Sequence, residues 1–390
     1  MSAARAVAVA LAGAVLTGAP LLPSAPASAA GKCAAPARKV VGAVPWAQRV
    51  LAPERAWALT RGGGLIVGIV DTGVSAATPA LSGAVLSGRD VLAHGAADTD
   101  CRGHGTFVAG LLAARPKAGS GLAGIAPGVR LLPIRVAPDE NQVDPGPLAA
   151  GIRAAVAGGA RVIAVGVATA TSTSALRGAV AYANAHDVVV VASTDMAGMS
   201  ATGDAVYPAG LPGVLAVASV EADGRPASSL GSKERPDLAA PGSDLLSVAP
   251  RGNGNVTASG SGVAVAFVAG AAALVRAYRP GLKAGEVRHR LEATADHPTG
   301  RLPDPAVGYG MADPVAAVTT ALPEESGEPA PEPHVRQVHF VLPPRPDRDR
   351  EHRALVTAAT VGSAAALGWL VIATIRRGRR RGWRPGTGQD

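Results

Sequence analysis

Two side chains with acid–base chemistry stand in motifs that can bring them together. Asp71 lies in the apolar run LIVGIVDTGV at residues 65–74, where a buried strand is expected to give way to a turn. His104 lies in DCRGHGTFVAG at residues 100–110, at the expected start of a helix. An aspartate that orients a histidine, which takes a proton from a nucleophile, is the arrangement of nucleophilic acyl transfer. The pattern therefore predicts an Asp–His pair and raises the question of a third residue.

A third motif stands where that nucleophile is expected. Residues 260–270 read GSGVAVAFVAG, which resembles GTSMAAPHVAG, the nucleophile motif of the subtilisin-like serine proteases. The shared VAG sets the register, in which Ser261 replaces the threonine, Gly262 the catalytic serine and Ala266 the proline. Asp71 and His104 match the family's other two motifs, in the family's chain order. The resemblance implies the subtilisin fold, with a retained charge-relay pair and Gly262 at the nucleophile position.

The oxyanion-binding positions also depart from the family pattern. The family has VVVVAAAGN, whose asparagine stabilises the oxyanion, whereas this chain has VVVVASTDM at residues 188–196. Met196 takes the asparagine position and Asp195 takes the glycine position. A thioether donates no hydrogen bond, and a nearby carboxylate repels an oxyanion. The strand that lines the substrate cleft, VINLSLG in the family, appears as VIAVGVA at residues 162–168.

These replacements favour a pseudoprotease. In a subtilisin, loss of the serine alone lowers turnover about 10⁶-fold. The retained Asp–His pair then has a structural interpretation, as a buried and hydrogen-bonded brace.

The alternative is an active serine endopeptidase that uses Ser261 or Ser259. Ser261 is one residue before the nucleophile position, however, and one step along a helix turns a side chain by about 100°. Asn253 and Asn255 are candidate oxyanion donors, but Gly-Asn-Gly-Asn is typical of a turn. In a third interpretation, which the altered cleft strand disfavours, the cleft remains as a receptor for an extended peptide.

The body of the chain, residues 46–320, alternates apolar runs with helical stretches. Strands are expected at 66–70, 129–135, 161–167, 188–192 and 214–220, and helices at 105–114, 147–158, 174–185, 262–278 and 284–294. This alternation predicts an α/β three-layer sandwich with a parallel central sheet and helices on both faces. The composition, 48% apolar but 3% aromatic, indicates a core of Ala, Val, Leu and Ile.

Both ends of the chain carry targeting features. Residues 1–30 have the form of a secretory signal peptide, and residues 31–45 form an N-terminal extension. A Pro- and charge-rich stalk is expected at 321–353, because such a segment cannot bury a core. Residues 354–375 form an uncharged run of 22 residues, about 33 Å as a helix and long enough to cross a bilayer.

The charges indicate how the chain meets a membrane. Six arginines follow the apolar run in the tail 376–390, so the positive-inside rule predicts a cytoplasmic tail and an extracellular main domain. This tail accounts for much of the net charge of +8 and favours anionic lipid headgroups as its partner, not nucleic acid. The sequence calls for no cofactor or metal. In an exported protein the only two cysteines, Cys33 and Cys101, are most simply one disulfide, worth about 4 kcal/mol for a loop of about 69 residues.

The whole arrangement resembles the mycosins, which are membrane-anchored, subtilisin-like proteases of type VII secretion systems. The signal peptide, the cysteine in the N-terminal extension, the cysteine close to His104, the wording GHGTFVAG, the GYG at 308–310, the stalk and the C-terminal anchor occur in the same order. The resemblance implies a partner, the membrane complex of the secretion machinery. It does not carry over the nucleophile, the oxyanion asparagine or the cleft strand, because those positions do not match.

Overall fold

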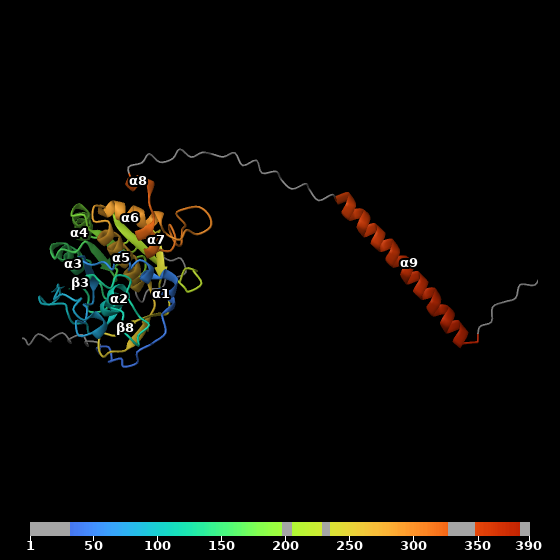
Figure 1. The fold of residues 1–390 in the computed structure, drawn as a ribbon, viewed down its shortest axis with the longest axis horizontal. Helices are drawn as coiled ribbons and strands as arrows, with labels where there is room; N and C mark the ends of the chain where they lie inside the picture. Colours follow the sequence, from blue (N-terminus) through green and yellow to red (C-terminus); the bar gives the residue numbers. More distant parts are fainter. Residues whose placement is uncertain (1–31, 197–204, 228–234, 327–347, 383–390) are drawn as a thin grey trace, which may run out of the picture. The chain divides into compact units, whose positions relative to one another are not determined.

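The computed structural model describes residues 32–196, 205–227, 235–326 and 348–382. The chain divides into two units, Met1–Ser326 and Gly327–Asp390 (Figure 1). The first contains a folded domain and the second contains one long helix. The predicted signal peptide lies outside the described residues.

A parallel sheet of seven strands forms the centre of the folded domain, in the spatial order β2-β3-β1-β4-β5-β6-β7. The strands are β1 (Ile66–Asp71), β2 (Arg89–Asp90), β3 (Arg130–Arg135), β4 (Val162–Val165), β5 (Val189–Ser193), β6 (Val214–Val220) and β7 (Leu238–Pro241). A separate antiparallel pair joins β8 (Leu245–Val248) to β9 (Asn255–Ala258). The connections run in opposite directions on the two sides of β1, so the carboxyl ends of β1 and β4 form a topological switch point, where α/β proteins commonly place their sites.

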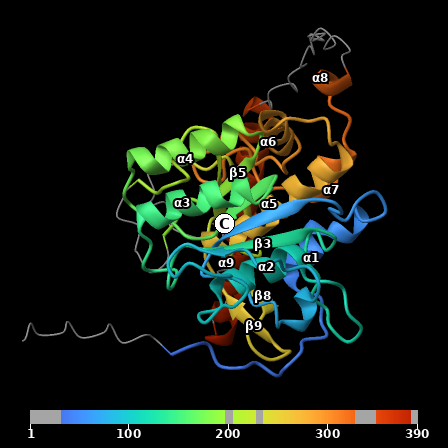
Figure 2. The ribbon, with the colours of Figure 1, turned by 90° about the vertical axis from the view of Figure 1, so that its left-hand side faces the viewer.

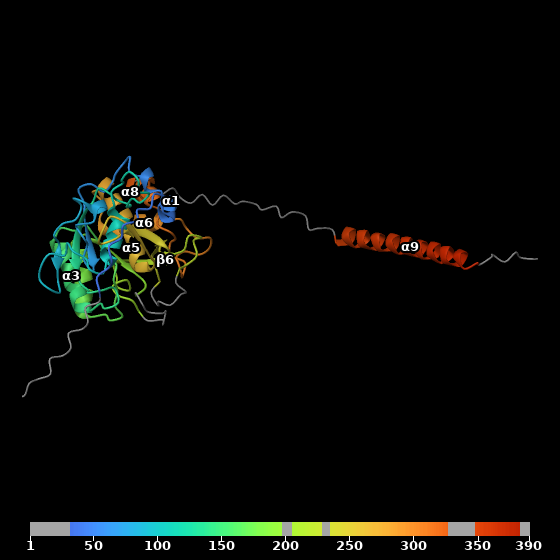
Figure 3. The ribbon, with the colours of Figure 1, turned by 90° about the horizontal axis from the view of Figure 1, so that it is seen from below.

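Helices cover both faces of this sheet. They are α1 (Trp46–Leu51), α2 (His104–Ala113), α3 (Pro145–Ala157), α4 (Ser174–Ala185), α5 (Ser261–Tyr278), α6 (Ala284–Ala293), α7 (Pro314–Thr319) and α8 (Pro323–Ser326). Helices α3 and α4 pack on one face, and α2 and α5 pack on the other (Figure 2). The view from below separates α3 from α5 and α6 in the same way (Figure 3). The predicted three-layer α/β fold is therefore confirmed.

Alternation along the strands explains why the sheet is buried on both sides. In β5, Val189 and Val191 join the core shared with α2 and α5, whereas Val190 and Ala192 join the core shared with α3 and α4. Successive side chains of a strand point to opposite faces, so a continuous apolar run supplies both cores. The side chains of α5 that fill the first core are mostly small, which lets this helix lie close to the sheet.

The predicted strands and helices agree with the observed ones to within two residues at most boundaries. Strands β2, β7, β8 and β9 and the short helices α1, α7 and α8 were not predicted from the sequence. Strand β2 has two residues, and β7 reads LAAP, which lacks β-branched side chains and ends in Pro241. Proline is tolerated in β7 because this strand lies at an edge of the sheet.

The folded domain continues past the expected limit at residue 320. Glu325 in α8 forms ion pairs with Arg279, at 3.2 Å, and with the fully buried Arg290. Arg290 also donates to the carbonyl oxygens of Ala317 and Thr320. These charge-assisted contacts hold the chain against the folded domain as far as Glu325.

The second unit contains α9 (Arg348–Arg380), which includes the predicted apolar run 354–375. Its residues His352–Arg380 are long and apolar enough to cross a membrane, and none of this stretch is buried in the protein. Helix α5, with 18 residues, is also long and apolar enough, but 83% of it is buried as the core helix of the folded domain. The chain thus carries one apolar C-terminal helix that has the properties of a membrane anchor.

The N-terminal extension lies along the folded domain from residue 32 onward. Its Cys33 forms the predicted disulfide with Cys101, with an S–S distance of 2.03 Å. Further along, Ala37 donates to the Arg251 carbonyl at 3.0 Å and accepts from the Gly254 N–H at 3.0 Å. These contacts tie the extension both to the loop before α2 and to the loop that joins β8 to β9.

Candidate functional site

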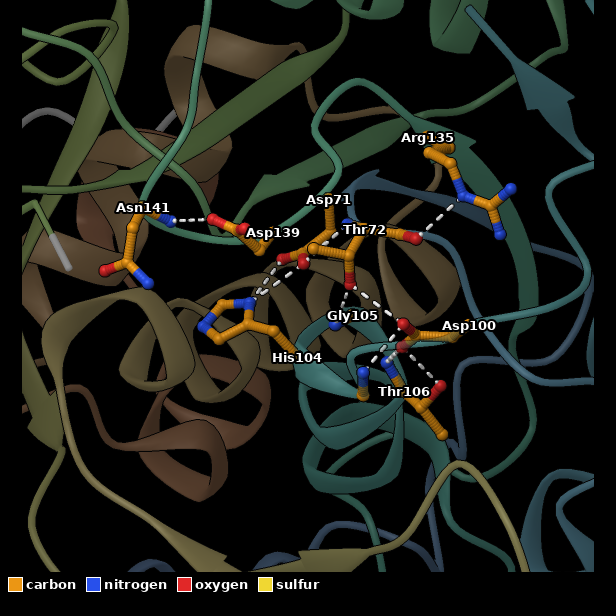
Figure 4. Close-up of polar contacts among 10 residues, drawn as sticks. Asp71, Thr72, Asp100, His104, Gly105, Thr106, Arg135, Asp139 and Asn141 are labelled. Carbon is orange, nitrogen blue, oxygen red and sulfur yellow. Dashed lines mark hydrogen bonds and ion pairs between the residues drawn. The ribbon is translucent and has the colours of Figure 1, made fainter. Parts of the chain in front are cut away.

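Asp71 and His104 meet at the carboxyl end of the sheet (Figure 4). Asp71 is the last residue of β1 and His104 is the first residue of α2. His104 Nδ1 lies 2.8 Å from Asp71 Oδ1 and 3.0 Å from Oδ2. Asp71 is fully buried, whereas 14% of the His104 side chain is exposed. The structure therefore brings together the two residues that the sequence analysis paired.

Asp100 holds the start of α2 against the end of β1. Its carboxylate accepts hydrogen bonds from the backbone N–H groups of Gly103, at 2.7 Å, and Thr106, at 2.9 Å. It also accepts from the Thr72 hydroxyl at 3.1 Å, and that hydroxyl accepts from the Gly105 N–H at 3.0 Å. The sequence analysis assigned no role to Asp100, although an acidic residue shortly before a helix is a capping signal.

Gly105 permits the close approach of the two elements. A β-carbon at this position would lie 3.0 Å from Asp71 Cβ and closer than that to the Gly73 carbonyl oxygen. The glycine of the GHGT motif therefore lets the first turn of α2 contact the end of β1. This contact brings His104 within hydrogen-bonding distance of Asp71.

The environment of His104 favours its protonated form. Burial lowers the pKa of His104, but the negative charge of Asp71 and its hydrogen bond outweigh this effect, with smaller contributions from Glu140 and Asp100. Together they raise the pKa of His104 from 6.5 to about 9. At neutral pH the pair is thus an imidazolium that donates from Nδ1 to a carboxylate. Glu140 lies in the loop after β3, where Asp139 accepts from the Asn141 N–H at 3.0 Å (Figure 4).

Gly262 lies beside the other imidazole nitrogen. It is the second residue of α5, and a β-carbon added there would lie 3.4 Å from His104 Nε2. The same β-carbon would lie within 3.0 Å of the carbonyl oxygen of Gly166, which follows β4. A β-carbon on Gly166 would in turn overlap Asp71 Oδ2 and lie 3.3 Å from both Gly262 O and His104 Cε1. Two replacements that are far apart in the sequence, at 166 and 262, therefore pack against each other.

Ser261 is turned toward a different set of residues. Its hydroxyl forms a short hydrogen bond with the Asp195 carboxylate and lies 3.0 Å from Ser219 Oγ. The residue is only 1% exposed. Met196, the next residue after Asp195, is half-buried and is the last described residue before the gap at 197–204.

The remaining polar candidates form contacts at the surface or within loops. Ser259 is exposed, and its Oγ accepts from the Asp244 N–H at 2.9 Å. Asn253 is exposed in the loop before β9. The side chain of Asn255 accepts from the Val41 N–H at 2.8 Å and donates to the Ser247 carbonyl at 3.3 Å, so it braces the N-terminal extension. Within the described ranges, no three or more His, Cys, Asp or Glu side chains gather to form a metal site.

Comparisons with known proteins agree with this geometry. Residues 62–310 match the model of the subtilase family. Mycosin-4 of Mycobacterium tuberculosis is 34% identical over 375 residues, which cover 85% of this chain and 81% of that protein.

Solved structures give the same assignment. The MycP3 protease from the type VII (ESX-3) secretion system superposes with a TM-score of 0.65 and 32% identity, covering 75% of this chain and 93% of that one. A chain in the periplasmic assembly from the ESX-5 inner membrane complex superposes with a TM-score of 0.66 and 29% identity, covering 81% and 94%. On these grounds the chain belongs to the subtilase family and, within it, to the mycosins.

Proposed function

We propose that this mycosin is a pseudoprotease, which serves as a membrane-anchored structural or binding subunit of a type VII secretion complex. The observation that carries the proposal is the contact between Gly262 and Gly166 beside His104. In an Asp–His–Ser triad the histidine takes its proton from a serine hydroxyl at this place, and glycine offers no side chain. Loss of the serine in a subtilisin lowers turnover about 10⁶-fold.

The packing at this position indicates that more than one residue has to change before a serine fits at 262. The Gly166 carbonyl occupies the space that a β-carbon at 262 would need, and Gly166 itself tolerates no β-carbon beside Asp71. A serine introduced at 262 would therefore have to displace the backbone after β4. We interpret the pair Asp71–His104 as a buried brace between β1 and α2, with Gly262 at the lost nucleophile position and Met196 at the lost oxyanion position.

The second candidate function, an endopeptidase that uses another serine, has weaker support. The Ser261 hydroxyl is bonded to Asp195 and is nearly inaccessible, so a substrate carbonyl has no path to it. Ser259 is accessible, but its Oγ accepts from the Asp244 N–H, which does not act as a base. A retained cleft for extended peptides would need open space beside 166–168, where Gly262 instead packs closely.

The proposed partner follows from the relatives. Two of the similar structures are chains of the ESX-5 inner membrane complex, and one relative is a protease of the ESX-3 type VII system. For this chain we propose export by residues 1–30, an extracellular domain, a stalk, a single membrane span in α9 and a cytoplasmic tail. The arginines at the end of α9 are suited to anionic lipid headgroups.

A fluorophosphonate probe tests the absence of an activated serine. The full-length chain in detergent should show no covalent labelling and no peptide hydrolysis above background, while an active subtilase in the same detergent reacts. Mass spectrometry of the treated protein locates any adduct. Stoichiometric phosphonylation at Ser261 or Ser259 would disprove the proposal.

A complementation assay tests the scaffold role. Deletion from Ala354 onward should abolish support of secretion, because the anchor supplies the effective concentration that a weak contact needs. The variant His104→Gln should retain that support to the extent that it folds. Complete loss in a stably folded His104→Gln protein, with full function of the anchor deletion, would point instead to soluble catalysis.

A further inference from the structure

A carboxylate from the loop after β5 lies at the start of α5. Asp195 lies in a tight turn, where its N–H donates to Ser193 Oγ at 3.1 Å and its carbonyl accepts from the same hydroxyl at 2.8 Å. The Asp195 carboxylate accepts a short hydrogen bond from the hydroxyl of Ser261, the first residue of α5. Ser261 Oγ also contacts Ser219 Oγ in β6 at 3.0 Å. This cluster joins the carboxyl ends of two strands to the start of the helix.

The start of α5 is a favourable place for a negative charge. The helix has 18 residues, and its N-cap residue Gly260 has no side chain to cap the first turn. The positive end of the helix dipole stabilises a carboxylate placed there. Ser261 and Ser219 are 1% and 3% exposed, whereas Asp195 is half-buried, so dissolved salt can still screen part of its charge.

We infer that Asp195 is an internal anion at the start of α5, next to Met196, which stands at the position where the family's asparagine binds the oxyanion. The inference rests on the proposed function, since only an inactive subtilase has no substrate oxyanion to accommodate there. A peptide carbonyl in this site would develop its negative charge beside the Asp195 carboxylate, which is already bonded to the helix start. Asp195 thus excludes acyl substrates and at the same time holds α5 against β5 and β6.

The first test separates charge from shape. Equilibrium unfolding of the full-length chain in detergent is compared between wild type and Asp195→Asn over a range of NaCl concentrations. Asparagine keeps the volume and can still accept from Ser261, but it lacks the charge. At low salt the unfolding constant should rise about two- to five-fold, the size of a charge–dipole interaction, and the difference should shrink as salt rises. No difference, or one that salt does not change, overturns the inference.

The second test asks whether the vacated position binds an external anion. In Asp195→Ala the helix start and the Ser261 hydroxyl become available to sulfate. Sodium sulfate should stabilise this variant more than wild type, beyond the effect of sodium chloride at equal ionic strength. Asp313→Ala is the matched control, because Asp313 is also a carboxylate at a helix start, where it accepts from the backbone N–H groups of Val315 and Ala316 in α7. Equal sulfate stabilisation of all three proteins contradicts the inference, and Asp195→Asn decides it if Asp195→Ala does not fold.

The outcomes distinguish this inference from the proposed function. Phosphonylation of a serine in the wild type would end the pseudoprotease proposal without changing the salt and sulfate results. If the stability difference between wild type and Asp195→Asn did not change with salt, the internal-anion inference would be refuted. The proposal that position 262 lacks the nucleophile would be unaffected.

Discussion

The contact between Gly262 and Gly166 gives a quantitative prediction for the substitution Gly262→Ala. A β-carbon at 262 would approach the Gly166 carbonyl oxygen within 3.0 Å, a distance that real β-carbons do not show. The obstacle is backbone, so the end of β4 or the first turn of α5 must move. Overpacking of this kind costs about 1–3 kcal/mol.

The chain contains a matched control for the effect of glycine on helix stability. Gly285 is the second residue of α6, as Gly262 is of α5, and a β-carbon there meets no atom within 4 Å. Neither glycine has a positive φ angle, so the backbone dihedral angles at both positions suit alanine. Gly285→Ala should gain up to about 1 kcal/mol from helix propensity. Gly262→Ala has the same gain but also the steric cost, so it should be about 1–3 kcal/mol less stable than Gly285→Ala.

Urea unfolding of the full-length proteins in detergent, followed by far-ultraviolet circular dichroism, measures this difference. A Gly262→Ala protein as stable as Gly285→Ala would refute the reasoning, because the site would then have room for a side chain. In that case Gly262→Ser would also fit, and packing would not be what keeps a serine out of position 262. If the packing is tight, Gly262→Ser should be destabilised and should remain inactive toward the fluorophosphonate probe.

Three further predictions concern the charge pair, the disulfide and the membrane. The raised pKa of His104 contributes stability that is fully present below pH 6.5 and is lost as pH rises through about 9. The difference in unfolding free energy between wild type and His104→Gln should therefore fall by up to about 3 kcal/mol between pH 6 and pH 10. A pH-independent difference would contradict the Asp71–His104 ion pair. Reduction of Cys33–Cys101, or the variant Cys33→Ser, should lower stability by up to about 4 kcal/mol, and an unchanged urea midpoint would exclude this role of the loop closure. Protease added to intact cells should release the folded domain and leave the tail after α9 protected, whereas protection of the domain would reverse the proposed orientation.

The central elements were predictable because their patterns are local. Val189 to Ser193 form an apolar, β-branched run, which is typical of a buried parallel strand, and Ser174–Ala185 begins after a threonine that caps the helix. The pairing of Cys33 with Cys101 followed from an exported chain with two cysteines. Strand β7 was missed because LAAP has no strand signal of its own, and its pairing with β6 depends on the rest of the sheet.

By itself the sequence determined the fold class, the Asp–His pair, the identity of the residues at 166, 196 and 262, and the apolar C-terminal helix, because motif spacing and residue type carry that information. Only the tertiary structure decided that Gly166 and Gly262 pack against each other, that Ser261 turns to Asp195, and that Asp100 joins α2 to β1. Each of these contacts joins residues that belong to different parts of the fold. The distance between the two residues of each contact depends on how α5 and α2 pack on the carboxyl end of the sheet. A pattern of residue types predicts which surfaces are apolar, but the separation of two backbones is set by side-chain volumes across the whole interface.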